Sequence, residues 1–178
     1  MEGLRKYILE KIDKKIFCFL KKNYSIMPKR FCKWIAYFYT DARIRKLYWK
    51  RLNVFMGKGT YSNIGMMAVF NGNDTKVHIG NNVSIAPYVM FITESDPNNG
   101  KEILELEYLN NLRVKGDIIV EDEVWIGANV TILPGVHIGK CSIIGAGSVV
   151  TKDVDSYGIY VGVPARKIRD IRDEKNNE

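Results

Sequence analysis

The chain has 178 residues, of which 46% are hydrophobic and 26% charged, and a formal net charge of +7. This composition is typical of a globular protein long enough to bury a core, and it excludes disorder as the main state. No run approaches the ~20 apolar residues of a membrane span, and no secretory signal is recognised, so we expect a cytoplasmic protein. The spacing of Cys18, Cys32 and Cys141 indicates neither a disulfide framework nor a zinc ribbon.

The basic charge is concentrated in the first part of the chain. Residues 1–52 hold 15 of the 27 basic and 4 of the 20 acidic residues, which leaves 12 basic and 16 acidic residues for the rest. The same segment holds 11 of the 20 aromatic residues. The pattern predicts a basic helical appendage at 1–52, followed by a mildly acidic main domain.

Three helices are expected in this appendage. An apolar residue returns every four positions at Leu4, Ile8, Ile12, Ile16 and Leu20. This spacing predicts an amphipathic helix with lysines on its other faces. Pro28 permits a second helix over 28–39, and 41–52 is expected to form a third. The apolar residues at helical spacing in the second helix are Phe31, Trp34, Ile35 and Phe38.

Two interpretations of the basic appendage remain open. Its helices cover the end of the main domain or mediate subunit contacts, or they lie on anionic lipid at the inner face of the cell membrane. Near such lipid each Lys or Arg gains about 1 kcal/mol, and aromatic side chains settle at the headgroup level. We expect no binding of nucleic acid, since no recognised nucleic-acid motif accompanies the charge.

The main domain carries a sixfold repeat. An aliphatic residue returns every six positions at Val120, Ile126, Ile132, Ile138, Ile144 and Val150. The same register includes Ile79, Ile85 and Phe91. Ordinary strands would alternate with a period of two, whereas this period is typical of a parallel β-helix with three short strands per coil. We therefore predict a mainly-β solenoid over 53–170, with an excursion loop at about 97–119 and a charged tail at 171–178.

Three segments carry a family resemblance: IGNNVSIAPYV, EDEVWIGANVTILPGVHIGKCSIIGAGSVVTKDV and YVGVPARKI. They resemble the hexapeptide-repeat acyltransferases, in particular the sugar and polysaccharide O-acetyltransferase group that includes galactoside and maltose acetyltransferases. The resemblance covers about 58–170 and is most specific over 125–167. It implies a left-handed parallel β-helix, a homotrimer and acetyl-CoA bound between adjacent subunits. The left hand comes from the resemblance alone, since general connection rules favour the opposite hand.

The resemblance also implies a coenzyme site. The positions that match it are Ala128, Ala146, Thr151, Lys152, Arg166 and Arg169. Ala128 and Ala146 match small residues whose backbone faces the pantetheine arm, and their separation of 18 residues predicts that they stack on successive coils. The other four match groups around the adenosine and its phosphates, where Lys and Arg supply charge-assisted hydrogen bonds.

The expected general base departs from the family pattern. The resemblance implies a histidine just before the excursion, where this chain has Asp96. A carboxylate with a pKa near 4 is poorly suited to take a proton at neutral pH, whereas histidine near 6.5 is well suited. Counted in coils of 18 residues, His78, Asp96 and His137 share one outward-facing column, with coils about 4.8 Å apart.

We therefore predict that one of the two histidines is the base, with His78 slightly favoured, and that Asp96 orients it. The alternative is that both histidines are ordinary surface residues and Asp96 only binds the acceptor. Glu94, Ser95 and the excursion segment GKEILELEYLNNLRVKG are the expected acceptor contacts, because loops that leave a rigid solenoid can vary in specificity. The apolar residues of that segment are equally suited to packing on a neighbouring subunit: Ile103, Leu104, Leu106 and Leu109.

The leading functional prediction is an acetyl-CoA-dependent O-acetyltransferase that acts on a sugar or lipid-linked glycan hydroxyl. One alternative is an N-acetyltransferase of an amino sugar, because a neutral amine needs less help from a base. Another is a catalytically inactive subunit that serves binding or assembly. A zinc enzyme similar to γ-type carbonic anhydrases would need three histidines, and the chain has two, so no metal is expected.

Overall fold

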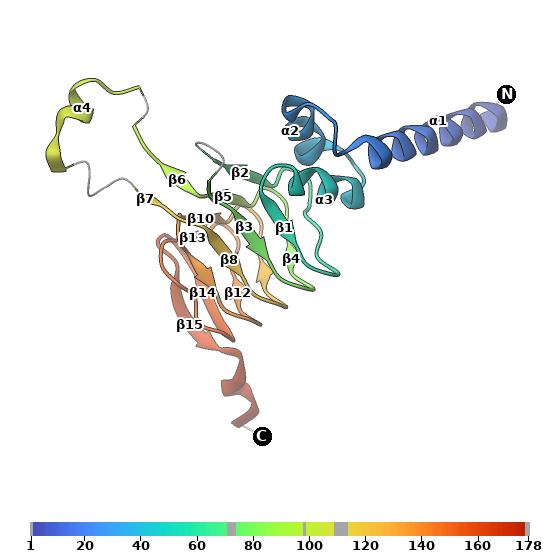
Figure 1. The fold of residues 1–178 in the computed structure, drawn as a ribbon. Coiled ribbons are helices and arrows are strands. Elements are labelled where there is room, and N and C mark those ends of the chain that lie inside the picture. The colour runs from blue at the N-terminus through green and yellow to red at the C-terminus, as the bar shows by residue number, and fades with distance from the viewer. Residues whose placement is uncertain (1, 71–73, 98, 109–113, 177–178) are drawn as a thin grey trace.

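The computed structural model describes residues 2–70, 74–97, 99–108 and 114–176 (Figure 1). Its N-terminal part contains helices α1 (Glu2–Asn23), α2 (Lys29–Phe38) and α3 (Ala42–Lys50), which confirms the three expected helices. Asp41 caps α3, because its side chain accepts hydrogen bonds from the backbone N–H groups of Arg43 (2.8 Å) and Ile44 (3.4 Å).

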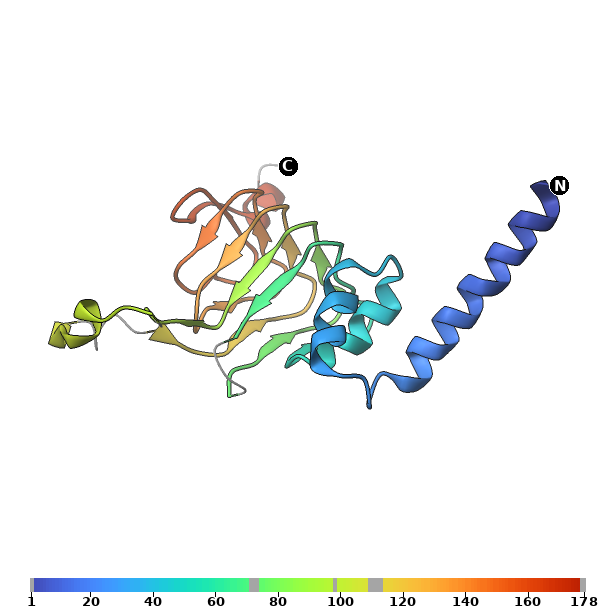
Figure 2. The same ribbon diagram turned by 90° about the horizontal axis from the view of Figure 1, so that it is seen from above.

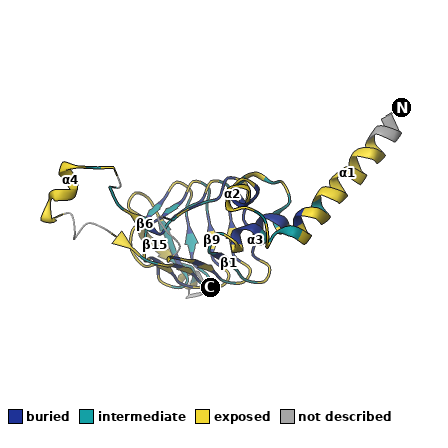
Figure 3. Ribbon diagram, turned by 45° about the horizontal axis from the view of Figure 1, so that its top comes forward, coloured by how far each residue is buried: buried dark blue, intermediate teal, exposed yellow. Residues whose placement is uncertain are grey.

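The three helices differ in how they meet the rest of the molecule. Helix α3 packs against α2 and against the first strand of the main domain, while most of α1 extends away from the body (Figures 1 and 2). Figure 3 shows that most of α1 is exposed, and of its described apolar stripe only Leu20 is buried. The predicted apolar face of α2 is only partly buried, since Ile35 is buried but Trp34 is exposed. Within the described residues, no helix combines the length and the apolar character needed to cross a membrane.

The main domain is a three-sided stack of coils built from three sheets, whose strands run parallel except for the last strand of sheet 2. Sheet 1 contains β1 (Val54–Met56), β3 (Val77–Ile79), β8 (Ile118–Val120) and β11 (His137–Ile138). Sheet 2 contains β4 (Ser84–Ile85), β9 (Trp125–Ile126), β12 (Ile143–Ile144), β14 (Gly158–Val161) and β15 (Arg166–Asp170). Sheet 3 contains β2 (Met67–Val69), β5 (Met90–Ile92), β10 (Thr131–Ile132) and β13 (Val149–Val150).

The sixfold repeat fills the interior of this stack, as predicted. All six aliphatic residues from Val120 to Val150 are buried, and in sheet 3 the register aligns Phe91 with Ile132 and Ile132 with Val150. A side chain on an inner coil, such as Ile132, is therefore covered by its equivalents on the coils above and below. This is the packing that a solenoid needs, because a single coil cannot bury its own apolar face.

The corners between sheets 1 and 2 repeat one backbone conformation. Asn82, Glu123 and Cys141 each occupy this corner with a positive φ, between 53° and 60°. Side chains connect successive corners: Asp122 Oδ1 accepts a hydrogen bond from the backbone N–H of Asn81 at 2.6 Å, and this bond lowers the pKa of Asp122. The corner thus has the same shape in successive coils, which keeps the strands in register.

The excursion begins and ends earlier than the sequence predicts. The chain leaves the coil after β5 through β6 (Glu94–Ser95), forms α4 (Glu102–Glu105), and returns through β7 (Val114–Lys115), which pairs antiparallel with β6. Thr93 fixes the exit, since its buried Oγ1 lies 2.6 Å from Thr75 Oγ1 and its carbonyl accepts from Gly116 N–H. Residues 117–119 already belong to the next coil, so the expected excursion at 97–119 is wrong at both ends.

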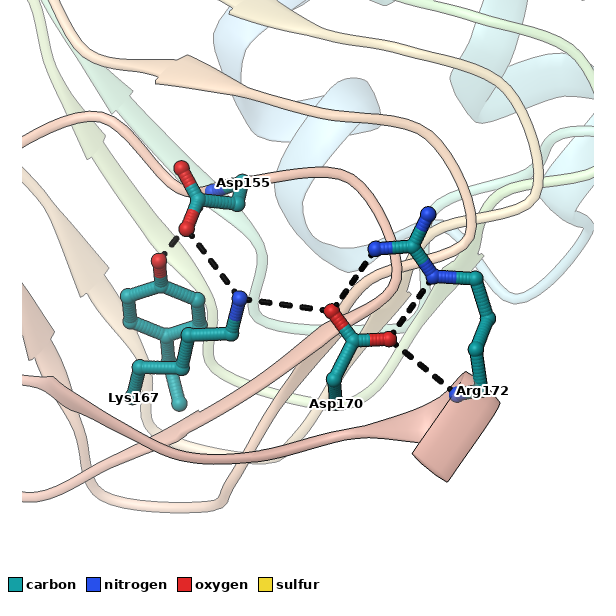
Figure 4. Close-up of polar contacts among 5 residues, drawn as sticks. Asp155, Lys167, Asp170 and Arg172 are labelled. Atoms are coloured by element: carbon teal, nitrogen blue, oxygen red, sulfur yellow. Dashed lines mark hydrogen bonds and ion pairs between the residues drawn. The ribbon is translucent and has the colours of Figure 1, made fainter. Parts of the chain in front are cut away.

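A charged hairpin closes the C-terminal end. Strand β15 pairs antiparallel with β14, and a 3-10 helix follows at Ile171–Asn176. Lys167 Nζ lies 3.2 Å from Asp155 Oδ2 and 3.3 Å from Asp170 Oδ2 (Figure 4). Asp170 also accepts hydrogen bonds from Arg172, which hold the pKa of this carboxyl well below its usual range.

Candidate active site

The two histidines share the outer face of sheet 1. The register aligns His78 with Ile119 and Ile119 with His137, so the predicted column is confirmed for both histidines. It is wrong for Asp96. Because the chain leaves the coil after Thr93, Asp96 enters the excursion, and Ile119 takes the place between the two imidazoles.

His137 has a carboxylate partner that sequence reasoning missed. Its Nε2 lies 2.9 Å from Glu121 Oε1, and the other oxygen of Glu121 accepts a hydrogen bond from the backbone N–H of Lys140 at 2.8 Å. A carboxylate fixed on one side and bonded to an imidazole on the other is the arrangement that orients a histidine base. The signal was present in the sequence, because Glu121 lies two residues after Ile119 and alternate strand residues share a face.

His78 has a different environment. Its ring stacks on Phe55, with the centroids 5.3 Å apart and the planes at 16°. The two side chains line a shallow groove together with Gly57 and Gly80. Within the described part of the chain, no hydrogen bond or ion pair holds the His78 ring, which is exposed.

The two alanines that were predicted to face the pantetheine arm lie at the corner between sheets 2 and 3. Ala128 lies between β9 and β10, and Ala146 lies one coil further, between β12 and β13. The Ala128 carbonyl accepts a hydrogen bond from Gly147 N–H at 2.8 Å. Successive corners are packed so closely that a Cβ on Gly127 would lie 2.6 Å from Ala146 N. The stacking prediction is therefore confirmed, and Ala146 is exposed at this corner.

Two of the four predicted phosphate contacts meet in one small pocket at the C-terminal end of the coil. Lys152 and Arg166 line it together with Tyr160, Asp153 and Lys167. Lys167 was not predicted, and its ammonium already contacts Asp155 and Asp170.

The other two predicted phosphate contacts lie outside this lining. Thr151 is exposed directly before Lys152, and Arg169 lies on β15 in register with Ile159.

The predicted acceptor contacts lie at the base of the excursion. Glu94 and Ser95 form β6, in register with Lys115 and Val114. Of the apolar residues in the excursion, Ile103, Leu104 and Leu106 are exposed, and Leu109 falls outside the described residues. The exposed residues thus have little packing against the coil of their own chain.

One chain does not bring the candidate base and the stacked alanine corner together. His78 and His137 lie on the face of sheet 1, whereas Ala128 and Ala146 lie at the corner of the other two sheets. These are different sides of the three-sided coil. Among the residues that the structure describes, no group of three His, Cys, Asp or Glu side chains is placed to hold a metal ion.

Comparison with known proteins identifies the repeat. The family model described as bacterial transferase hexapeptide (six repeats) matches residues 117–152. A galactoside O-acetyltransferase from Lactococcus lactis subsp. lactis (strain IL1403) is 37% identical over 126 residues, which cover 68% of this chain and 55% of the relative. The chain thus spans about half the length of this curated relative.

Solved structures of acetyltransferases share the fold. A galactoside acetyltransferase in complex with coenzyme A has a TM-score of 0.64 at 27% identity, covering 89% of this chain and 86% of that one. A hexapeptide-repeat acetyltransferase from Vibrio cholerae O1 biovar eltor, complexed with acetyl coenzyme A, has a TM-score of 0.64 at 26% identity, covering 80% and 85%. By its repeat, its fold and these similarities, the chain belongs to the hexapeptide-repeat acetyltransferase group.

Proposed function

We propose that this protein is an acetyl-CoA-dependent O-acetyltransferase with a left-handed coil that acts on a sugar or glycan hydroxyl. The observation that carries the proposal is the stacked Ala128 and Ala146 corner, on the coil whose C-terminal end holds the pocket of Lys152 and Arg166. The narrow pantetheine arm needs a surface without large side chains, and the phosphates of CoA need cations. Similar acetyltransferases have been solved with CoA and with acetyl-CoA, which supports a coenzyme site at this corner and pocket.

The proposed base is His137, with Glu121 in the orienting role that the sequence assigned to Asp96. The imidazole takes the proton of the acceptor hydroxyl, and the acceptor oxygen attacks the thioester carbonyl. A C–O bond forms, the C–S bond breaks, and CoA leaves as the thiol after taking up a proton. His78 lies two strands away on the same face and is proposed to contact the acceptor.

The separation of the two candidate sites supports a homotrimer in which adjacent subunits complete one active site. The coenzyme corner of one subunit would then face the histidine column of the next. Glu94 and Ser95, at the base of the excursion, are proposed to contact the acceptor from the subunit that carries them.

Calorimetric titration with acetyl-CoA tests the coenzyme site without knowledge of the acceptor. We expect micromolar binding that the double variant Lys152→Ala/Arg166→Ala weakens by about tenfold or more, because two charge-assisted contacts are lost. The matched control is Arg30→Ala/Lys33→Ala, which removes the same two charges from exposed positions of α2. Absence of binding, or equal weakening in both variants, contradicts the proposal.

A second proposal concerns location: the basic helices hold the enzyme at the cytoplasmic face of the membrane. The observation that favours it is the exposed aromatic face of α2, where Phe31, Trp34 and Phe38 are 60%, 62% and 57% exposed beside the exposed Arg30 and Lys33. Cations beside exposed aromatic rings suit an anionic interface. Flotation with phosphatidylglycerol vesicles tests it, and a protein that stays unbound at low salt contradicts it.

A further inference from the structure

A second pocket lies between the helices and the first coil. It has a volume of about 660 Å³ and is formed by residues of α1, α3, β1 and the segment that follows β1. Four of its lining residues are cationic, namely Lys21, Arg43, Lys46 and Lys50, and none of its described lining residues is acidic. The volume falls within the range of about 300–1,000 Å³ that is usual for small-molecule sites.

Two of the cations are held in place by neighbours. The Arg43 guanidinium lies 4.9 Å from the centre of the Phe17 ring and forms an ion pair with Asp41 at 2.6 Å. The Lys46 ammonium donates to the Gly57 carbonyl and lies 5.0 Å from the centre of the Tyr61 ring. Burial lowers the pKa of Lys46, so an anion beside it would favour its charged form.

The remaining charge of the pocket is uncompensated. Asp41 offsets Arg43, whereas no described carboxylate lies within ion-pair distance of Lys21, Lys46 or Lys50. Three lysines that converge on one concave surface favour a ligand with two or three negative charges. A diphosphate group carries such a charge in a compact form.

The pocket continues toward the histidine column. Phe55 and Met56 line both this pocket and the groove that contains His78, and the Phe55 ring stacks on His78. His137 lies two strand spacings further along the same face, roughly 10 Å away. A molecule anchored by its anionic end in the pocket can therefore extend along Phe55 and His78 toward the proposed base.

We propose that this pocket binds the diphosphate of the acceptor, so that the substrate is a sugar carried on a diphosphate. The inference rests on the proposed acetyltransferase function and adds the class of acceptor. The same chemistry has two sources, a soluble nucleotide diphosphate sugar and a lipid diphosphate sugar. Both place a sugar next to a diphosphate, and the experiment separates them.

The test measures binding of inorganic pyrophosphate to the full chain by calorimetry in the presence of saturating CoA, which removes competition from the phosphate sites of the coenzyme. The variant Lys21→Glu/Lys50→Glu reverses two charges of the pocket, and we expect its affinity to fall by about tenfold or more. The control Lys14→Glu/Lys33→Glu makes the same change in net charge at exposed positions outside the pocket and should bind as the wild type does. Equal losses in both variants, or no pyrophosphate binding, would overturn the proposal.

Two further arms identify the source and separate this proposal from the coenzyme site. Competition by UDP-glucose indicates a soluble acceptor, and competition by farnesyl diphosphate in phosphatidylcholine vesicles indicates a lipid-linked one. Competition by neither overturns the assignment of the acceptor class. The variant Lys152→Ala/Arg166→Ala should keep its pyrophosphate affinity even where acetyl-CoA binding is lost, so the two proposals can fail independently.

Discussion

The coil and helix α1 use apolar residues in opposite ways. In the coil, the aliphatic residue of each six-residue unit is buried between its equivalents, as Ile126, Ile132 and Ile138 show. In α1, Ile12 and Ile16 remain 48% and 45% exposed, although their spacing is just as regular. A regular pattern therefore indicates an apolar face, and only the neighbouring elements determine whether that face is covered.

The largest expected effect concerns the outer face of the coil. We expect His137→Asn to lower kcat/KM by about 10²-fold or more, because a general base contributes about 10²–10⁴-fold. His78→Asn should have a smaller effect, expressed mainly in KM for the acceptor, and Glu121→Gln should lower kcat by about tenfold through a misoriented imidazole. Steady-state assays with a screened acceptor measure these values. Full activity in both histidine variants would show that neither histidine takes part in catalysis.

The comparison between coil and helix can be tested directly with two equivalent truncations. Ile132→Ala removes a fully buried side chain and should cost about 2–5 kcal/mol in the free energy of unfolding. Ile12→Ala makes the same change on exposed α1 and should alter it by no more than about 0.5 kcal/mol. Urea unfolding measures both. Similar losses would mean that α1 is covered in solution, for example by another copy of the chain.

The junction between helices and coil depends on one buried cation. Arg45 is 3% exposed and donates hydrogen bonds to the carbonyls of Tyr39, Thr40 and Ser62. Arg45→Met keeps much of the length but leaves these carbonyls without their donor, at a cost of about 2–3 kcal/mol. In this variant, exchange of the backbone amide hydrogens should accelerate more in α2 and α3 than in the coil. Uniform acceleration throughout the chain would show that helices and coil unfold as one unit.

The smallest effect is expected at the exposed C-terminal hairpin. Arg172 lowers the pKa of Asp170, so the stabilisation is complete above the ordinary carboxyl pKa and is lost as the pH falls through the lowered value. Asp170→Asn should therefore speed hydrogen exchange in β15 at pH 7, and the difference from the wild type should shrink as the pH falls below about 4. A difference that is constant with pH would mean that Asp170 acts through packing and not through its charge.

The sequence pattern correctly predicted the features that recur from coil to coil. Its prediction was wrong where the excursion interrupts the repeat. The six aliphatic positions, the stacking of Ala128 on Ala146 and the alignment of His78 with His137 all follow from counting in sixes. The place of Asp96 did not follow. The exit from the coil is determined by a hydrogen bond between the buried hydroxyls of Thr75 and Thr93, and no count reveals which residue ends a coil.

The sequence also did not predict which side chains contact one another. The contact between Glu121 and His137 crosses from one coil to the next and advances two residues, so the predicted register placed the two residues near each other but did not show which side chain bonds to the imidazole. The cationic pocket was missed for a similar reason. Its lysines and arginine come from α1 and α3, and their convergence depends on how these helices meet β1.

The two ends of the coil determine its length. Helix α3 packs against β1, the first strand of sheet 1, and the charged β15 protects the last edge of sheet 2 from pairing with another strand. The coils between them share one six-residue pattern, so the cationic pocket near the first coil and the pocket of Lys152 and Arg166 near the last are separated by a whole number of coils. Duplicating residues 123–140 would add one coil and move the two pockets about 4.8 Å further apart, and each pocket would keep its own lining residues. The distance between the two proposed ligands would therefore change in steps of one coil.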